Sequence, residues 1–105
     1  MNSQLKRGLL EFCVLAVLKK GESYGYQIVK DVSRVIDMSE STLYPILKRL
    51  EAGEYVKSHS VEYNGRLRKY YQITQGGEYY IKEFLKDWNQ VTEVYNFIKG
   101  VIEDE

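Results

Sequence analysis

Residues 4–19 carry apolar side chains around most of the circumference of a helix. One set recurs at helical spacing: Leu5, Leu9, Phe12, Cys13, Ala16 and Val17. A second set fills much of the remaining surface: Leu10, Val14, Leu15 and Leu18. A helix of this kind must be covered on two sides. We expect the domain's own core on one side and a partner chain on the other. Gly21 then ends the helix, and Glu22-Ser23 predicts a very short strand.

Residues 24–36 predict a second helix with a narrow apolar face. The inner positions are Tyr24, Ile28, Val32 and Val35, and the solvent-facing positions are Lys30, Asp31 and Arg34. Gly25 costs about 1 kcal/mol of helix propensity relative to alanine. Its presence therefore indicates a close approach by another backbone or by a phosphate.

A third helix is expected between Ser39, which suits an N-cap, and Gly53, which suits a terminator. Its inner stripe follows the spacing i, i+3, i+4, i+7 and consists of Leu43, Ile46, Leu47 and Leu50. The outer face then carries Ser41, Thr42, Tyr44, Pro45, Lys48 and Arg49. Pro45 is unusual there because proline removes a backbone hydrogen bond inside a helix.

Residues 55–62 and 67–74 alternate in character and are rich in Tyr, Val and Ile. They flank Asn64-Gly65, a strong short-range signal for a β-hairpin. After the hairpin, Thr74 is a plausible N-cap for a final helix that reaches about Val101. The order is therefore three helices, a hairpin and one long helix, which predicts a mainly α fold with a small β-hairpin.

The final helix carries a heptad pattern with an apolar seam. The a positions are Ile81, Trp88, Tyr95 and Ile102, and the d positions are Phe84, Val91 and Ile98. The b, c and f positions are mainly polar. A seam this long extends beyond the small body formed by the other elements. Self-association is the simplest way to cover it, with Leu9 and Phe12 of the first helix joining the interface.

Length and charge narrow the classes of function. The 105 residues suit one folding unit, and 15 basic groups balance 15 acidic ones. Residues 41–77 hold six basic and three acidic groups, whereas residues 78–105 hold three and seven. The positive field is therefore local to the third helix and the hairpin, although an asymmetry of this size also arises by chance.

Other chemistry finds little support in the sequence. The single cysteine, Cys13, lies in an apolar run and reads as a core residue, so no disulfide framework within the chain is expected. His59 has no neighbouring nucleophile or carboxylate array, and Gly76-Gly77 only opens a helix. No apolar run is long enough to span a bilayer. We therefore expect a cytoplasmic protein without enzymatic activity, metal or cofactor, and without a membrane partner.

The order of elements is that of a winged helix-turn-helix (residues 1–77) with an appended dimerisation helix (residues 78–105). Several stretches resemble the PadR-type transcriptional regulators: RGLLEFCVL at 7–15, YGYQI at 24–28, STLYPILKRLE at 41–51 and GRLRKYYQIT at 65–74. The short tail resembles the subfamily with a single C-terminal helix. That resemblance implies a ligand-responsive repressor, in which a flat aromatic compound binds between two subunits against a tryptophan that matches Trp88.

In a winged helix the third helix enters a DNA major groove about 12 Å wide. We expect DNA contacts from its outer face: Ser41, Thr42, Tyr44, Pro45, Lys48 and Arg49. The hairpin adds Arg66, Arg68 and Lys69, and the second helix adds Tyr24 and Tyr26. The alternatives stay open: Lys48 and Arg49 as a solvated face, and the tyrosines as packing residues. One of Arg68 and Lys69 should face the core edge, because strand side chains alternate.

A dimer would present two such helices to half-sites about 34 to 36 Å apart, which predicts a pseudo-palindromic operator. The predicted interface consists of Leu9, Phe12, Ile81, Phe84, Trp88, Val91, Tyr95 and Ile98. A ligand beside Trp88 could then change the spacing of the two helices and release the DNA. A fully packed interface without a cavity is the alternative to ligand binding. The competing function is a winged helix that binds another protein instead of DNA.

Overall fold

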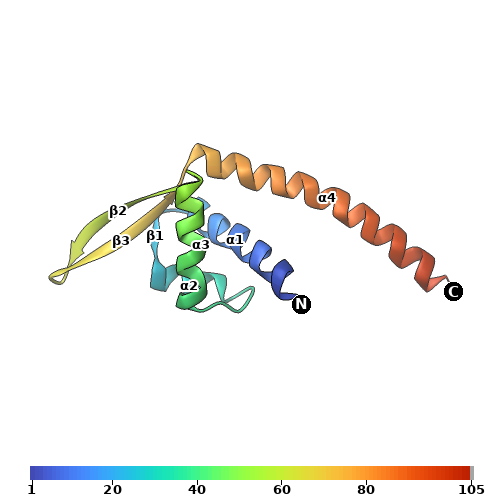
Figure 1. Cartoon of the computed structure of the whole chain (residues 1–105), viewed down its shortest axis with the longest axis horizontal. Helices are drawn as coiled ribbons and strands as arrows, with labels where there is room; N and C mark the ends of the chain where they lie inside the picture. The colour runs from blue at the N-terminus through green and yellow to red at the C-terminus, as the bar shows by residue number, and fades with distance from the viewer. Residues whose placement is uncertain (105) are drawn as a thin grey trace.

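The computed structural model describes residues 1–104 and contains four helices and a three-stranded antiparallel sheet (Figure 1). The helices are α1 (Ser3–Lys19), α2 (Gly25–Val32), α3 (Glu40–Ala52) and α4 (Gln75–Glu103). The strands are β1 (Ser23–Tyr24), β2 (Val56–Tyr63) and β3 (Arg66–Ile73), in the spatial order β1-β3-β2. This is a winged helix with a long C-terminal helix, and the predicted fold class is confirmed.

The core lies where α1, α2, α3 and the inner face of the sheet meet. The inner stripe of α3 is fully buried, as predicted: Leu43, Ile46, Leu47 and Leu50. Burying one such side chain contributes about 1.5–3 kcal/mol. The stripe therefore fixes the rotation of α3 about its axis, which determines the residues that face outward.

Helix α1 is covered on two sides, but its second side contacts α4 of the same chain, where a partner chain was expected. Its fully buried side faces the core and consists of Leu10, Val14, Leu15 and Leu18. On the other side Phe12 stacks on Phe84 of α4, with ring centroids 3.9 Å apart. These two predicted dimer residues thus contact each other within one chain. Leu9 is half-buried and Leu5 is exposed, so part of this side stays open.

Helix α2 is shorter than the sequence pattern indicates. It ends at Val32, and residues 33–35 form a turn. The placement of Val35 on the inner face is wrong, because this side chain is 82% exposed. The Ser33 hydroxyl donates to the carbonyl of Met38, and Met38 packs into the core instead.

The predicted caps and hairpin turn are confirmed. The Ser39 hydroxyl accepts from the Thr42 N–H at the start of α3, and the Thr74 hydroxyl accepts from the Gly77 N–H at the start of α4. Asn64 (φ 51°) and Gly65 (φ 77°) both adopt the left-handed conformation. A two-residue type I′ turn requires this conformation at both positions. Tyr63 therefore pairs directly with Arg66, and the short strand predicted before α2 appears as β1, paired with β3.

Helix α4 begins against the body and then leaves it, on the side opposite the hairpin (Figure 1). Tyr80 stacks on Tyr55 with ring centroids 4.1 Å apart, and Phe84 reaches α1. Every residue from 85 to 104 is exposed. Glu105, the last residue of the predicted dimerisation segment, lies outside the described residues.

The exposed half of α4 is more apolar than the heptad pattern indicates. Besides the a/d seam, Val94, Phe97 and Val101 share a second strip at the spacing i, i+3, i+7, and Phe97 is 72% exposed. The polar back predicted for this helix therefore becomes narrower in the second half, where Phe97 occupies a c position. Within residues 1–104, no helix has the length and hydropathy needed to cross a membrane.

Candidate nucleic-acid interface

Helix α3 presents its polar face to solvent. All six predicted contact residues are exposed: Ser41, Thr42, Tyr44, Pro45, Lys48 and Arg49. The buried stripe on the opposite face holds them there. Pro45 lacks an N–H, so the carbonyl of Ser41 does not receive the hydrogen bond that an ordinary helix would give it at this position.

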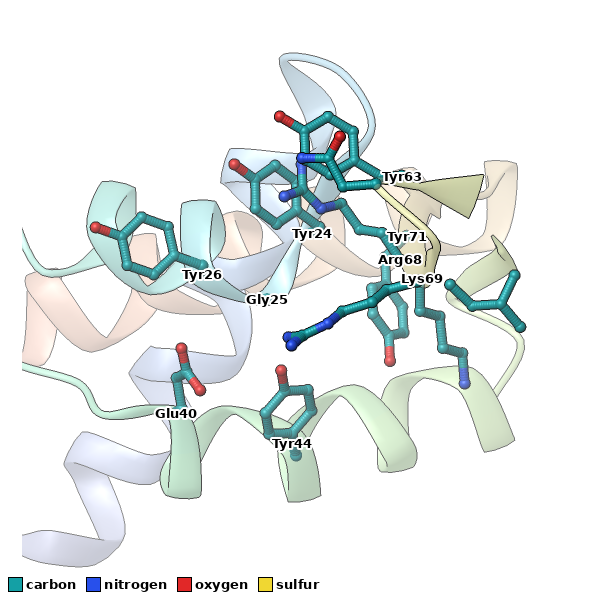
Figure 2. A pocket seen from close by; sticks show the side chains of 12 residues that line it. Tyr24, Gly25, Tyr26, Glu40, Tyr44, Tyr63, Arg68, Lys69 and Tyr71 are labelled. Atoms are coloured by element: carbon teal, nitrogen blue, oxygen red, sulfur yellow. The ribbon is translucent and has the colours of Figure 1, made fainter. Parts of the chain in front are cut away.

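An open groove with a volume of about 680 Å³ lies between α3 and the wing, the β2–β3 hairpin (Figure 2). It is lined by Tyr24, Gly25, Tyr26, Glu40, Tyr44, Tyr63, Asn64, Arg66, Leu67, Arg68, Lys69 and Tyr71. The lining combines five tyrosines, three cationic side chains and one carboxylate. It therefore offers hydroxyl donors and positive charge, the groups that phosphate oxygens accept from.

Tyr44 occupies the floor of this groove, with its hydroxyl directed at α2 (Figure 2). A Cβ atom on Gly25 would lie 2.5 Å from the Tyr44 hydroxyl oxygen. The close approach predicted at Gly25 exists, but a side chain makes it, instead of a backbone or a phosphate. Burial and then the nearby Glu40 charge raise the pKa of Tyr44. The hydroxyl therefore stays protonated and can donate a hydrogen bond.

The three cationic side chains of the wing have different surroundings. Arg66 follows the turn directly and is exposed at the rim of the groove. The Arg68 guanidinium carbon lies 4.1 Å from the ring centre of Tyr24 and 4.1 Å from that of Tyr63. The Lys69 ammonium lies 3.6 Å from a carboxylate oxygen of Glu51. The predicted alternation is confirmed, because Lys69 lies on the same strand face as buried Tyr71.

The two tyrosines predicted from α2 also differ. Tyr24 is half-buried, and its ring meets Tyr70 edge-on with centroids 5.5 Å apart. Its ring therefore takes part in packing, which was the alternative interpretation. Tyr26 is exposed at the edge of the groove, where its hydroxyl is accessible.

Two basic residues beside α3 were not selected from the sequence. Lys6 and Arg7 line a hollow of about 300 Å³ together with Ser39 and Thr42 at the first turn of α3. A helix N-terminus attracts negative charge, and two cations beside it strengthen that attraction. The sequence pattern did not indicate that these two residues lie beside α3, because they are more than 30 positions away along the chain. The adjacent pair of basic residues early in α1 could have indicated a cationic site.

The predicted ligand residue and the α4 seam lie far from the groove. Trp88 is 38% exposed, and its ring centroid lies 5.7 Å from that of Phe84. Beyond it, Val91, Tyr95 and Ile98 line a shallow, open hollow of about 770 Å³ on α4. One chain thus provides one wall beside Trp88 and leaves the other side open.

The remaining reactive groups of residues 1–104 do not converge. His59 lies on the outer face of the sheet, 3.7 Å from a carboxylate oxygen of Glu22 and stacked on Tyr70. Burial raises the pKa of the Cys13 thiol, which favours its unreactive protonated form. Within the described residues, no three His, Cys, Asp or Glu side chains are grouped closely enough to hold a metal ion.

Comparisons with known proteins agree with this architecture. The model of the transcriptional regulator PadR-like family matches residues 14–83, more than half of the chain. A transcriptional regulator from Clostridium thermocellum is 34% identical, with a TM-score of 0.82, over 91% of this chain and 95% of that one. A PadR family transcriptional regulator from Eggerthella lenta is 30% identical, with a TM-score of 0.82, over 90% of this chain and 85% of that one.

Bacillus subtilis PadR, solved in complex with operator DNA, has the same fold at lower similarity. It is 24% identical with a TM-score of 0.69, over 73% of this chain and 46% of that chain. The matched segment of the family model begins within α1, contains α3 and the wing, and ends in the first turns of α4. The protein therefore belongs to the PadR-like family of transcriptional regulators.

Proposed function

We propose that this regulator binds duplex DNA as a homodimer and releases a pseudo-palindromic operator when a small aromatic ligand binds between the two α4 helices. The observation that carries the DNA-binding role is the groove between α3 and the wing. Exposed Tyr44 of α3 and exposed Arg66 of the wing line this groove, so the helix proposed to face the bases and a cationic residue of the wing border the same space. The operator complex of Bacillus subtilis PadR supports the same use of this fold.

On this proposal α3 enters the major groove with Ser41, Tyr44 and Lys48 toward the bases and phosphates. The phosphate backbone of the DNA then runs along the protein groove beside Tyr26. Arg66 lies along this backbone or in the adjacent minor groove of the DNA. Thr42 and Arg49 lie on the same helix. Lys6 and Arg7 of α1 add positive charge beside its first turn. Hydroxyl and ammonium groups at these places match the acceptor atoms of DNA.

The dimer is supported by the two apolar strips of α4. Large apolar side chains rarely gather on an exposed helix unless a partner covers them. The a/d seam and the strip of Val94, Phe97 and Val101 together point to cover from two directions. The α4 helix of a partner chain can pack on one strip, and the open side of the partner chain's α1 can pack on the other.

Ligand binding is supported by Trp88, the single tryptophan of the chain. Its ring is more than one third exposed and stands beside Phe84, so a partner helix would close an aromatic space around it. A ligand that binds one dimer shape more tightly shifts the population toward that shape and changes the distance between the two α3 helices.

The DNA-binding role is tested by the salt dependence of affinity for the DNA upstream of the gene. Arg66→Ala should reduce the slope of log K against log salt by about one unit. Arg34→Ala is the matched control, because Arg34 is 71% exposed and does not line the groove. An unchanged slope for Arg66→Ala would contradict the wing contact. Absence of binding at low salt, with a protein partner that co-purifies, would favour the protein-interaction alternative.

The dimer is tested by sedimentation equilibrium of paired variants. Ile98→Asp places a charge in the proposed interface and should shift the mass toward the monomer, because an unpaired charge is costly to bury. Asn96→Asp places the same charge two residues away, outside both apolar strips, and should leave the mass unchanged. Equal masses for the two variants would exclude the a/d seam as the interface.

The ligand site is tested by titrating flat aromatic compounds and following Trp88 fluorescence. A binder should change this emission and weaken DNA binding in the same concentration range. No response across a broad panel would contradict the ligand-responsive part of the proposal and would indicate a fully packed interface.

A further inference from the structure

The far half of the wing receives little support from the sheet. Strand β1 has only two residues, and it pairs with Tyr70 and Tyr71 of β3. From Arg68 to the turn, the wing is therefore a two-stranded hairpin with no third strand beside it. A two-stranded hairpin is only marginally stable on its own in water. The direction in which it carries Arg66 must depend on side-chain contacts.

On the outer face, Arg68 provides such a contact at the first row beyond β1. Its guanidinium lies between the rings of Tyr24 and Tyr63, 4.1 Å from each ring centre. Tyr24 belongs to β1, Arg68 to β3 and Tyr63 to the end of β2. One planar cation therefore links the fixed strand to the tip of the wing, as Figure 2 shows for these three labelled side chains.

On the inner face, Glu51 of α3 provides the opposing contact. Its carboxylate accepts a hydrogen bond from the Ser58 hydroxyl on β2. The other oxygen of this carboxylate lies 3.6 Å from the Lys69 ammonium on β3. One side chain of α3 thus joins both strands of the wing. The wing is held from its two faces, to β1 by Arg68 and to α3 by Glu51.

We propose that Arg68 and Glu51 are positioning residues that fix the angle of the wing to α3 and thereby aim Arg66, and that Arg68 does not contact phosphate itself. This role rests on the DNA-binding function proposed above. An arginine is suited to it because its planar guanidinium stacks on aromatic rings, whereas a lysine ammonium is compact and strongly hydrated. The positive charge of Arg68 therefore interacts with the rings of Tyr24 and Tyr63 instead of a DNA phosphate.

The first test needs no DNA and is amide hydrogen exchange of residues 60–67 in the free protein. Arg68→Lys keeps the charge but loses the stacking, so exchange in this segment should become faster. Glu51→Ala should have the same effect. Arg66→Ala and Glu62→Ala alter exposed wing residues without these contacts and are the controls. Wild-type exchange in both Arg68→Lys and Glu51→Ala would overturn the positioning role, even if DNA binding fails.

The second test is a double-mutant cycle of Arg66 and Arg68 on DNA affinity and its salt slope. If Arg68 acts through Arg66, Arg68→Lys weakens binding about as much as Arg66→Ala, by about tenfold, and the double variant loses little more. If Arg68 contacts phosphate, Arg68→Lys behaves like the wild type. In that case Arg68→Ala combined with Arg66→Ala lowers the slope by about two units. That result would overturn the positioning role while leaving DNA binding intact.

Thermal unfolding separates these effects from a general loss of structure. Each variant should keep the unfolding midpoint of the wild type to within a few degrees, because the hairpin beyond β1 buries little of the core. A large drop in the midpoint of Arg68→Lys would show that the residue supports the whole fold, and the specific role in aiming the wing would then be excluded.

Discussion

Adjacent glycines at the start of α4 offer a sharp test of how this helix is anchored. A Cβ atom on Gly77 would overlap the carbonyl oxygen of Tyr55 and lie 2.7 Å from the Cγ1 atom of Ile73. On Gly76 the same atom would lie 3.5 Å from the Thr74 hydroxyl oxygen and 3.6 Å from the Glu54 carbonyl, which are ordinary contacts. The two substitutions by alanine are therefore chemically identical but differ in the space available.

The expected magnitude for Gly77→Ala follows from what must move. The Tyr55 carbonyl also accepts the N–H of Thr74 at 3.0 Å, so it cannot retreat without weakening that bond. Overpacking costs about 1–3 kcal/mol and a weakened hydrogen bond about 1 kcal/mol more, whereas alanine returns at most about 1 kcal/mol of helix propensity. We expect a net loss of about 1–3 kcal/mol for Gly77→Ala. Gly76→Ala should gain between zero and about 1 kcal/mol.

Thermal unfolding followed by far-ultraviolet circular dichroism measures this difference. At about 4–8 °C per kcal/mol for a domain of this size, Gly77→Ala should unfold about 4–24 °C below the wild type. Gly76→Ala should unfold at or slightly above the wild-type temperature. Protein concentration must be matched, because the unfolding temperature of a dimer depends on concentration. Equal midpoints for the two variants would refute the close contact between α4 and Tyr55.

Two further predictions concern other contacts. Gly25→Ala should lower stability because its methyl would meet the Tyr44 hydroxyl oxygen. Tyr44→Phe removes that oxygen and should relieve the loss, because the nearest remaining ring carbon would lie 3.1 Å from the new methyl. A thermal double-mutant cycle should give a coupling of about 1 kcal/mol, and strict additivity would contradict the contact. The Lys19 ammonium, which donates to Glu78, holds the pKa of that carboxyl below its usual value. The free energy of unfolding in urea should be higher for the wild type than for Glu78→Gln at pH 7. This difference should disappear as the pH falls below about 4.5, because the carboxylate is then protonated. A difference that grows in acid would be inconsistent with this ion pair.

Local signals in the sequence predicted most of the fold. Ser39 and Thr74 cap helices through their own side chains, and Asn64-Gly65 determines its turn through two left-handed residues. These effects act within a few residues, so no knowledge of the rest of the chain is needed. The inner stripe of α3 was equally readable, because its helical spacing leaves one orientation that buries four large side chains.

The sequence pattern was incomplete at the end of α2 and along α4. Val35 fits the helical spacing of α2, but the helix ends at Val32, so Val35 is exposed and Met38, beyond the turn, is buried in the core. Phe12 and Phe84 were both expected at the dimer interface, and they stack on each other within one chain, a contact that periodicity cannot tell from one with a partner. The apolar strip around Phe97 was overlooked because the heptad template concentrates on a single seam.

The site was predicted as a set of residues but not as a network. Alternation along β3 showed that Arg68 and Lys69 lie on opposite faces. The partners that hold them, Tyr24 and Glu51, lie 44 and 18 residues away, and only the folded chain brings them together. Charge and strand position alone therefore could not separate a DNA contact from a positioning residue.

We propose that two chains joined through α4 present two α3 helices to one duplex. Native mass spectrometry of the protein with the DNA upstream of its gene tests this claim directly. We expect a complex of two 12.3 kDa chains per duplex at low salt, even when DNA is in excess. A complex with one chain per duplex, or no complex at low salt, would contradict it.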